Sequence, residues 1–373
     1  MFLWLWIILF KAHAAHKQIS NQQNQISEKE IEMEEELRNL IKVWISAIIS
    51  ISYCYYISSK LSKGFTRLLS LLPIFIIFLL LPLLLSSVHF CVISAFFLTW
   101  LANFKLLLFA FDQEPLSPLP LNLSRFFCFS CFPIKTSSRN PSSNRIYNKP
   151  SKWILAIKLL IFSFLLHVYR NNYDSGLSPS GFLALFTVHV YLEAELILVS
   201  VSTLLSMFLG CEIEPVFNEP YLATSLQDFW SRRWNLMVPA ILRPAVHIPV
   251  QRLFTPLLGL HGAFYSGMLA TFLVSGLMHE LFYFYMVRKS PTWEVTCFFL
   301  LHGVATSAEI AIKRTRWLPR PHLAVSGLAV AAFVIVTASW LFYPPVLRND
   351  VHKRIISECL LVVDVVKHML SVF

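Results

Sequence analysis

Residues 65–85 read FTRLLSLLPIFIIFLLLPLLL, an apolar run whose only charged residue is Arg67. A helix of about 20 apolar residues matches the thickness of the hydrocarbon core of a bilayer. Inside lipid every backbone N–H and C=O must be hydrogen-bonded within its own segment, so such a run forms a helix. Pro73 and Pro82 are compatible with this prediction, because prolines are tolerated in membrane helices and introduce kinks there. The stretch therefore predicts a transmembrane helix.

The same pattern recurs along the chain. The other predicted spans are 40–58, 88–111, 153–170, 181–207, 262–287, 293–312 and 322–343. With 56% hydrophobic residues, 14% charged residues and a mean hydropathy of +0.61, the chain cannot cover a soluble globular surface with polar groups. We therefore predict an all-α, multi-pass transmembrane bundle of about eight spans, forming one membrane domain over residues 40–343.

The distribution of charge predicts the orientation of the bundle. The connection at about 112–152 is rich in Pro, Ser and Asn, which is typical of a flexible loop, and its basic residues are Arg125, Lys135, Arg139, Arg145, Lys149 and Lys152. Basic connections stay in the cytosol. Counting crossings from this loop places residues 208–260 and 313–320 in the cytosol too. The net charge of +10 suits anionic headgroups and an acidic substrate, and no nucleic-acid-binding motif accompanies it.

The two ends of the chain differ from the predicted membrane domain. Residues 1–39 combine the short apolar run MFLWLWIILF with a Glu-rich lead-in, and we interpret them as an N-terminal extension. Residues 344–373 mix charges with Val, Leu and Ile, which fits either an interfacial amphipathic helix or a further membrane segment.

A lone CxxC pattern, Cys128 and Cys131, lies in the 112–152 loop. A structural zinc site needs four ligands, and neither a second cysteine pair nor a nearby histidine pair accompanies this one. We therefore expect no metal site.

The first segment that interrupts the apolar pattern is 221–235, YLATSLQDFWSRRWN. Thr224 or Ser225 could cap a helix, with Gln227 or Asp228 completing a capping box. The polar and aromatic residues that this helix would present are Trp230, Arg232, Arg233, Trp234 and Asn235. Aromatic rings mixed with arginines suit the membrane–water boundary. The segment is either an interfacial anchor or a site that binds an anionic head group while Asn235 points inward.

The second interruption is 272–285, FLVSGLMHELFYFY, in which His279 and Glu280 lie inside a predicted span. Ionisable residues are costly there, so a functional role is the default hypothesis. Ser275 and Gly276, about one turn earlier, would let another helix or a ligand approach closely. The alternative is a histidine that is hydrogen-bonded to a neighbouring helix.

A buried histidine suits the activation of an alcohol. A hydroxyl group is a poor nucleophile near neutral pH, and imidazole can remove its proton as it attacks a thioester carbonyl. A nearby asparagine can orient the imidazole or donate to the developing oxyanion. We therefore predict that Asn235 and His279 act together.

The chain resembles a known family at these two motifs. FWSRRWN, followed downstream by SGLMHE in an apolar helix, is similar to the membrane-bound O-acyltransferases. The opening from Met33, MEEELRNLIKVWISAIISISYCYYIS, looks like that of the plant long-chain-alcohol O-fatty-acyltransferases, the jojoba-type wax synthases. The resemblance covers residues 33–343 and implies that His279 is the essential histidine and Asn235 its partner. As substrate-binding candidates we take Trp230, Arg232, Arg233, Trp234, Ser275 and Glu280.

The resemblance also implies a location and a reaction. The expected location is the endoplasmic-reticulum membrane, with an internal chamber that acyl-CoA enters from the cytosol and the lipid acceptor enters from the bilayer. The expected reaction joins the acyl group of acyl-CoA to a long-chain fatty alcohol, without a further cofactor; a sterol is the alternative acceptor. A transporter is the alternative of another class, but the internal repeats typical of many transporters are not found in the sequence. The oligomeric state is not predicted.

Other ionisable residues lie in predicted spans. Glu193 and Glu195 either line an acceptor tunnel or pair with another helix. His302 and Glu309 are weaker candidates for a catalytic role.

Overall fold

The computed structural model describes residues 23–372, except 121, 136–151, 173–177 and 316–321. This part of the chain is built from helices and contains no β-strand. Eight of its helices are long and apolar enough to cross a membrane: Met33–Lys60, Phe65–Leu84, Val88–Ala110, Lys152–Asn171, Pro179–Leu209, Met237–Val287, Glu294–Thr315 and Leu323–Phe342. Each contains or overlaps one predicted span. The predicted fold class, an all-α multi-pass bundle, is confirmed.

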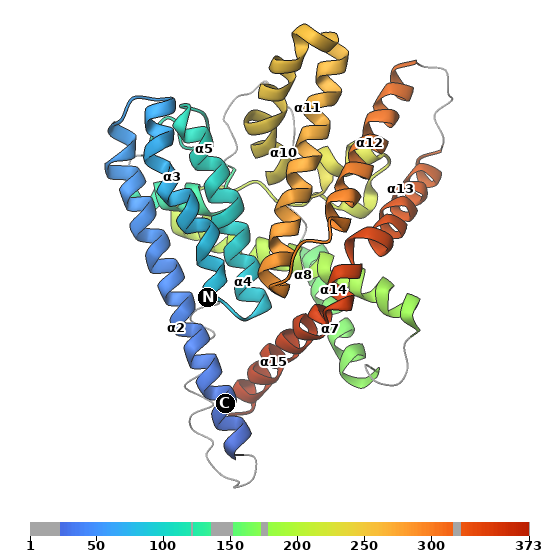
Figure 1. Cartoon of the computed structure of the whole chain (residues 1–373). Coiled ribbons are helices and arrows are strands. Elements are labelled where there is room, and N and C mark those ends of the chain that lie inside the picture. Colours follow the sequence, from blue (N-terminus) through green and yellow to red (C-terminus); the bar gives the residue numbers. More distant parts are fainter. Residues whose placement is uncertain (1–22, 121, 136–151, 173–177, 316–321, 373) are drawn as a thin grey trace.

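The first three spans pack side by side (Figure 1). Their helices are α2 (Gln23–Tyr56), α3 (Phe65–Leu80), and α4 (Val88–Ser94), which continues through the π-helix η3 (Ala95–Ala102) into α5 (Asn103–Ala110). On α2, Val43, Ala47 and Ile51 follow one another every four residues and are fully buried, whereas Ile45 and Ile49 are about half exposed or more. One apolar face therefore packs inside the bundle, and the opposite apolar face is suited to lipid.

Four spans accompany α11 (Ile248–Val287) in the rest of the chain. They are α7 (Lys152–Asn172), α8 (Pro179–Leu209), α12 (Glu294–Thr315) and α13 (Leu323–Thr337), which continues into the π-helix η7 (Ala338–Phe342). Short α14 (Pro344–Arg348) leads into α15 (Val351–Val372). Helix α12 lies against α11, and α15 runs back toward α4 and α7 (Figure 1).

The connection 208–260 is helical over much of its length, and its helices extend beyond the one that the sequence predicts within 221–235. Helix α10 (Met237–Leu242) and the π-helix η6 (Arg243–His247) lead into α11, which reverses direction at Gly259. Gly259 has φ 66° and ψ 177°, a conformation that only glycine adopts readily. A Cβ on Gly267 would lie 2.7 Å from the carbonyl oxygen of His247, so the two arms pack closely. Figure 1 shows the resulting hairpin, with its turn at the top.

The acidic lead-in and the first span belong to one helix, because α2 is continuous from Gln23 to Tyr56. The carboxylate of Glu36 accepts hydrogen bonds from the backbone N–H groups of Ser86 and Ser87, both at 2.8 Å. This acidic residue thus ties α2 to the connection before α4. The apolar run at residues 1–10 lies outside the described residues.

The predicted loop at 112–152 contains a helix, α6 (Leu123–Cys131), and is therefore not irregular throughout. Lys105, fully buried in α5, donates hydrogen bonds to the carbonyl oxygens of Phe129 and Phe132 at 2.8 and 2.5 Å. A lysine at the C-terminal carbonyls of a helix stabilises that end. Cys131 is fully buried, and burial raises the pKa of the Cys128 thiol to about 11.

The C-terminal segment forms α15, which is not among the eight helices of the described chain that are apolar enough to cross a membrane. Ile356 is buried against α4 and α7, and Glu358 reaches the first turn of α4. This arrangement favours the amphipathic alternative for the segment.

Candidate active site

The first motif folds as a short helical unit that starts at Ser225. The Ser225 side chain accepts a hydrogen bond from the Asp228 N–H at 3.0 Å and so caps α9 (Leu226–Asp228), as predicted. Glu309 of α12 accepts from the Leu226 N–H at 2.8 Å. Both acceptors pair N–H groups that the start of a helix leaves free. Glu309 therefore anchors the motif to α12.

The motif continues through the π-helix η5 (Phe229–Arg233) and ends at Asn235. The backbone of Asn235 has φ 34°, in the left-handed region that asparagine enters more readily than most residues. Its side-chain Oδ1 is buried and has no hydrogen-bond partner among the described residues. Because unpaired buried polar atoms are costly, this amide is suited to contact a bound molecule.

His279 of α11 is held in one tautomer. Its Nδ1 lies 2.7 Å from the carbonyl oxygen of Ser275, and a carbonyl can only accept. Nδ1 therefore carries the proton of the neutral ring, which leaves Nε2 with a free lone pair. The ring packs against Phe299, with a centroid distance of 4.4 Å.

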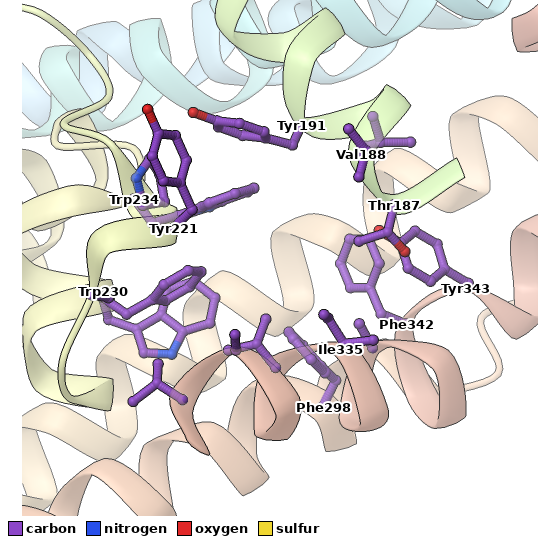
Figure 2. Close-up of a pocket in the computed structure, with 18 of the residues that line it drawn as sticks. Thr187, Val188, Tyr191, Tyr221, Trp230, Trp234, Phe298, Ile335, Phe342 and Tyr343 are labelled. Carbon is purple, nitrogen blue, oxygen red and sulfur yellow. The ribbon is translucent and has the colours of Figure 1, made fainter. Parts of the chain in front are cut away.

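His279 lines an aromatic cavity of about 250 Å³ between α8, η4 (Pro220–Leu222), η5, α11, α12, α13 and η7. Figure 2 shows Trp230 and Trp234 on one side, and Phe342 and Tyr343 on the other. Among the described residues, no lysine, arginine, aspartate or glutamate lines the cavity. Such a lining suits a hydrocarbon chain, and His279 is its most basic group.

The structure brings some of the predicted site residues together. Trp230, Trp234 and His279 share the cavity wall. Asn235 is not part of that wall and makes no hydrogen bond to His279, whose Nδ1 is paired with the Ser275 carbonyl. Trp234, next to Asn235, packs in the same hydrophobic cluster as Met278, next to His279. The two motifs are therefore neighbours without a hydrogen bond between these two polar side chains.

The other predicted substrate-binding residues have different surroundings. Arg232 is exposed, and its guanidinium makes no ion pair within the described chain. Arg233 pairs with Asp228 at 2.6 Å and donates to the Glu219 carbonyl at 3.2 Å. Buried Glu280 accepts from the Thr296 N–H at 3.1 Å and thus caps α12. Arg233 and Glu280 are therefore engaged within the protein.

Sequence reasoning missed most of the cavity wall, including Tyr191, Phe298 and Phe342. These residues lie in apolar runs, where an aromatic residue that faces a cavity looks the same as one that faces lipid. It also undervalued His302, which accepts a hydrogen bond from the Trp230 indole N–H at 3.1 Å.

The acidic residues Glu193 and Glu195 of α8 pair with other helices, which was one of the two predicted alternatives. Glu195 lies 2.6 Å from Lys158 Nζ of α7, and Glu193 pairs with His89 of α4. His89, Glu193 and Cys359 each place one potential metal-ligand atom within 4.8 Å of the others. However, the His89 ring is already paired directly with Glu193 and with Glu358, so the contacts are those of a hydrogen-bonded ion network.

Comparison with known proteins places this geometry in a family. Residues 213–301, which contain both motifs, match the model of the membrane bound O-acyl transferase family. The protein named "Probable long-chain-alcohol O-fatty-acyltransferase 2" of Arabidopsis thaliana is 82% identical over 336 residues, which cover 90% of this chain and 98% of the relative. "Probable long-chain-alcohol O-fatty-acyltransferase 1" of the same plant is 66% identical over 339 residues, with 90% and 98% coverage. The chain belongs to the plant long-chain-alcohol O-fatty-acyltransferases, within the membrane-bound O-acyltransferase superfamily.

Proposed function

We propose that the chain transfers a fatty acyl group from acyl-CoA to a long-chain alcohol and forms a wax ester, with His279 as the general base. The observation that carries the proposal is the tautomer of His279. Its Nδ1–H is held by the Ser275 carbonyl at 2.7 Å, so Nε2 is the nitrogen available to a substrate in the aromatic cavity. The names of the Arabidopsis relatives supply the acceptor class.

The reaction follows from this geometry. Nε2 of His279 takes the proton of the alcohol as its oxygen attacks the thioester carbonyl. The C–O bond forms, the C–S bond breaks, and the imidazolium returns the proton to the departing CoA thiolate. The products are the ester and free CoA, and His279 is neutral again.

Asn235 has a separate proposed role. Because the Ser275 carbonyl already orients the imidazole, the asparagine amide is not needed for that purpose. Its Oδ1 can only accept, so the Nδ2–H groups are the donors available to a substrate, and the neighbouring Trp234 lies in the cavity wall. We assign the amide to the developing oxyanion, where hydrogen-bond donors accelerate acyl transfer.

Exposed Arg232 and the basic connections suit the phosphates of CoA on the cytosolic side of the endoplasmic-reticulum membrane. This location is part of the proposal. It is tested by the co-migration of tagged protein with reticulum markers and by the protease accessibility of a tag in the connection at 112–152. If the tag is cleaved only after the membrane is opened, the connection lies in the lumen and the predicted topology is wrong.

The function is tested in microsomes from yeast that lack their own sterol acyltransferases. Labelled acyl-CoA is supplied with hexadecanol or with a sterol, to wild type, His279→Ala and His261→Ala. His261 lies on the same helix but is exposed, so it is the matched control. We expect label in wax ester with wild type and His261→Ala, and a loss of about 10²-fold or more in His279→Ala. Label in sterol ester would identify a sterol as the acceptor in place of a long-chain alcohol. The absence of any labelled ester from well-expressed wild-type protein would refute the proposal.

A further inference from the structure

His302 of α12 is completely buried directly behind the cavity wall. Its Nδ1 lies 3.1 Å from Trp230 Nε1, and an indole nitrogen can only donate. Nδ1 is therefore the acceptor, and the neutral ring carries its proton on Nε2. That nitrogen donates to Thr337 Oγ1 at 2.8 Å.

The chain of hydrogen bonds ends on α13, where the Thr337 hydroxyl donates to the Phe333 carbonyl at 2.6 Å. Each group in this chain donates to the next one, from Trp230 of η5 through His302 of α12 to Thr337 and the Phe333 carbonyl of α13. Both ring nitrogens of His302 are occupied, and the ring does not line the cavity. His302 is therefore unsuited to remove a proton from a substrate, in contrast to His279.

The hydrogen bond fixes the orientation of the Trp230 indole. The indole centroid lies 5.7 Å from Phe299, and Phe299 lies 4.4 Å from the His279 ring. Trp230 also packs edge-on against Phe272 at 5.7 Å. A rotation of the indole would therefore change the cavity and disturb the ring that supports His279.

We propose that His302 is a positioning residue that locks the Trp230 indole into the cavity wall and thereby sets the affinity of the site for an alkyl chain. This inference rests on the proposed function. Because the described lining contains neither lysine nor arginine, its occupant is a hydrocarbon chain and not the CoA head group. That chain belongs to the alcohol or to the acyl group of acyl-CoA, and the two arms of the test distinguish these sources.

The test measures binding to the full-length protein in detergent. A nitroxide-labelled hexadecanol and a nitroxide-labelled acyl-CoA quench tryptophan fluorescence, and the Trp230 contribution is the difference from Trp230→Phe. We expect His302→Leu to weaken one of the two ligands by about tenfold, as for the loss of a buried hydrogen bond. His302→Asn, whose amide oxygen can replace Nδ1 as acceptor, should restore most of the affinity.

The matched control is Thr306→Val, since Thr306 is a buried threonine of α12 whose hydroxyl has no partner among the described residues. It should bind both ligands as wild type does. In the Trp230→Phe background, His302→Leu should have no further effect on ligand affinity, measured there with the remaining tryptophans. In turnover assays, His302→Leu should raise the KM for the same substrate and reduce kcat less than His279→Ala does.

Three results would overturn the inference: additive losses in the double variant, equal losses in His302→Asn and His302→Leu, or unchanged affinity for both ligands. If His302→Leu does not fold, Thr337→Val replaces it, because this change removes only the far end of the hydrogen-bond chain. Ligand affinities of Thr337→Val alone and combined with Trp230→Phe then test the inference in the same way. The binding measurements do not depend on turnover. If the effects of His302 and Trp230 on ligand affinity are coupled but no ester is formed, the proposed function is refuted and this inference stands.

Discussion

Gly276 of α11 and Thr296 of α12 meet backbone to backbone, since a Cβ on Gly276 would lie 2.9 Å from Thr296 Cα. The contact lies one turn from His279, and Glu280 reinforces it by accepting from the Thr296 N–H at 3.1 Å. The close helix approach that the sequence predicts at Ser275 and Gly276 is therefore confirmed. It fixes His279 against Phe299, which α12 supplies.

The first prediction is that Gly276→Ala separates α11 from α12. The obstructing atom belongs to the backbone and cannot rotate away, so we expect a loss of about 1–3 kcal/mol of stability and a lower kcat. Thermal unfolding in detergent checks the stability, with Gly327→Ala as control because its Cβ would lie 3.5 Å from its nearest neighbour. Equal unfolding temperatures for the two variants would contradict the prediction.

The second prediction concerns Asn235. Its positive φ means that Asn235→Ala strains the backbone as well as removing the amide, so Asn235→Gly is the cleaner change. We expect Asn235→Gly to lower kcat by about 10²-fold or more, with a small change in unfolding temperature. Near-normal turnover in this variant would remove the amide from the mechanism.

The third prediction separates the two adjacent arginines. Arg232→Ala should raise the KM for acyl-CoA and leave stability and acceptor preference unchanged, because its exposed guanidinium has no partner within the described chain. Arg233→Ala should lower the unfolding temperature, since it breaks the pair with Asp228 at 2.6 Å. Kinetics and thermal unfolding of both variants check this, and an unchanged KM in Arg232→Ala would count against a role in CoA binding.

The fourth prediction concerns Lys158, whose ammonium lies 2.6 Å from Glu195 and 3.0 Å from Glu219. Lys158→Met would leave both carboxylates without their cation in a buried site, which costs about 3–5 kcal/mol. We expect a clear fall in unfolding temperature, whereas Lys152→Met, at an exposed position of the same helix, should be neutral. Similar behaviour of the two variants would show that the buried ion group does not stabilise the fold.

The fifth prediction concerns Glu358, which accepts from the N–H groups of Val88 and His89 at 2.9 and 3.1 Å. Burial opposes its ionisation, but these bonds and the His89 ring lower the pKa of Glu358 below its ordinary value. Its stabilising effect is therefore present at neutral pH and is lost as the pH falls through the folded-state pKa. We expect Glu358→Gln to cost about 1–3 kcal/mol near neutral pH.

The pH dependence provides the check on this last prediction. The difference in unfolding temperature between wild type and Glu358→Gln should shrink as the pH falls below about 4. Asp364→Asn, an exposed position on the same helix that pairs with Arg170, should give a small difference. A gap between wild type and Glu358→Gln that stays constant through acid pH would contradict the assignment.

Local patterns were sufficient for the features whose cause is local. The spans could be predicted because a membrane helix satisfies its own backbone, so length and composition decide it. Ser225 could be predicted as a cap because its partner, Asp228, lies three residues away. The prediction of a loop at 112–152 was only partly right. It missed helix α6, which is stabilised by buried Lys105 from another segment.

The sequence by itself determined the membrane fold, the positions of the spans and the candidate base His279. Only the tertiary structure decided which polar groups meet: Ser275 and not Asn235 holds the imidazole, and His302 holds Trp230. It also decided the reversal at Gly259 and the aromatic cavity. The physical reason is that contacts between helices depend on the rotation and depth of each helix relative to its neighbours. Periodicity within an apolar segment does not fix either quantity, since residues that face lipid and residues that face a cavity are equally apolar.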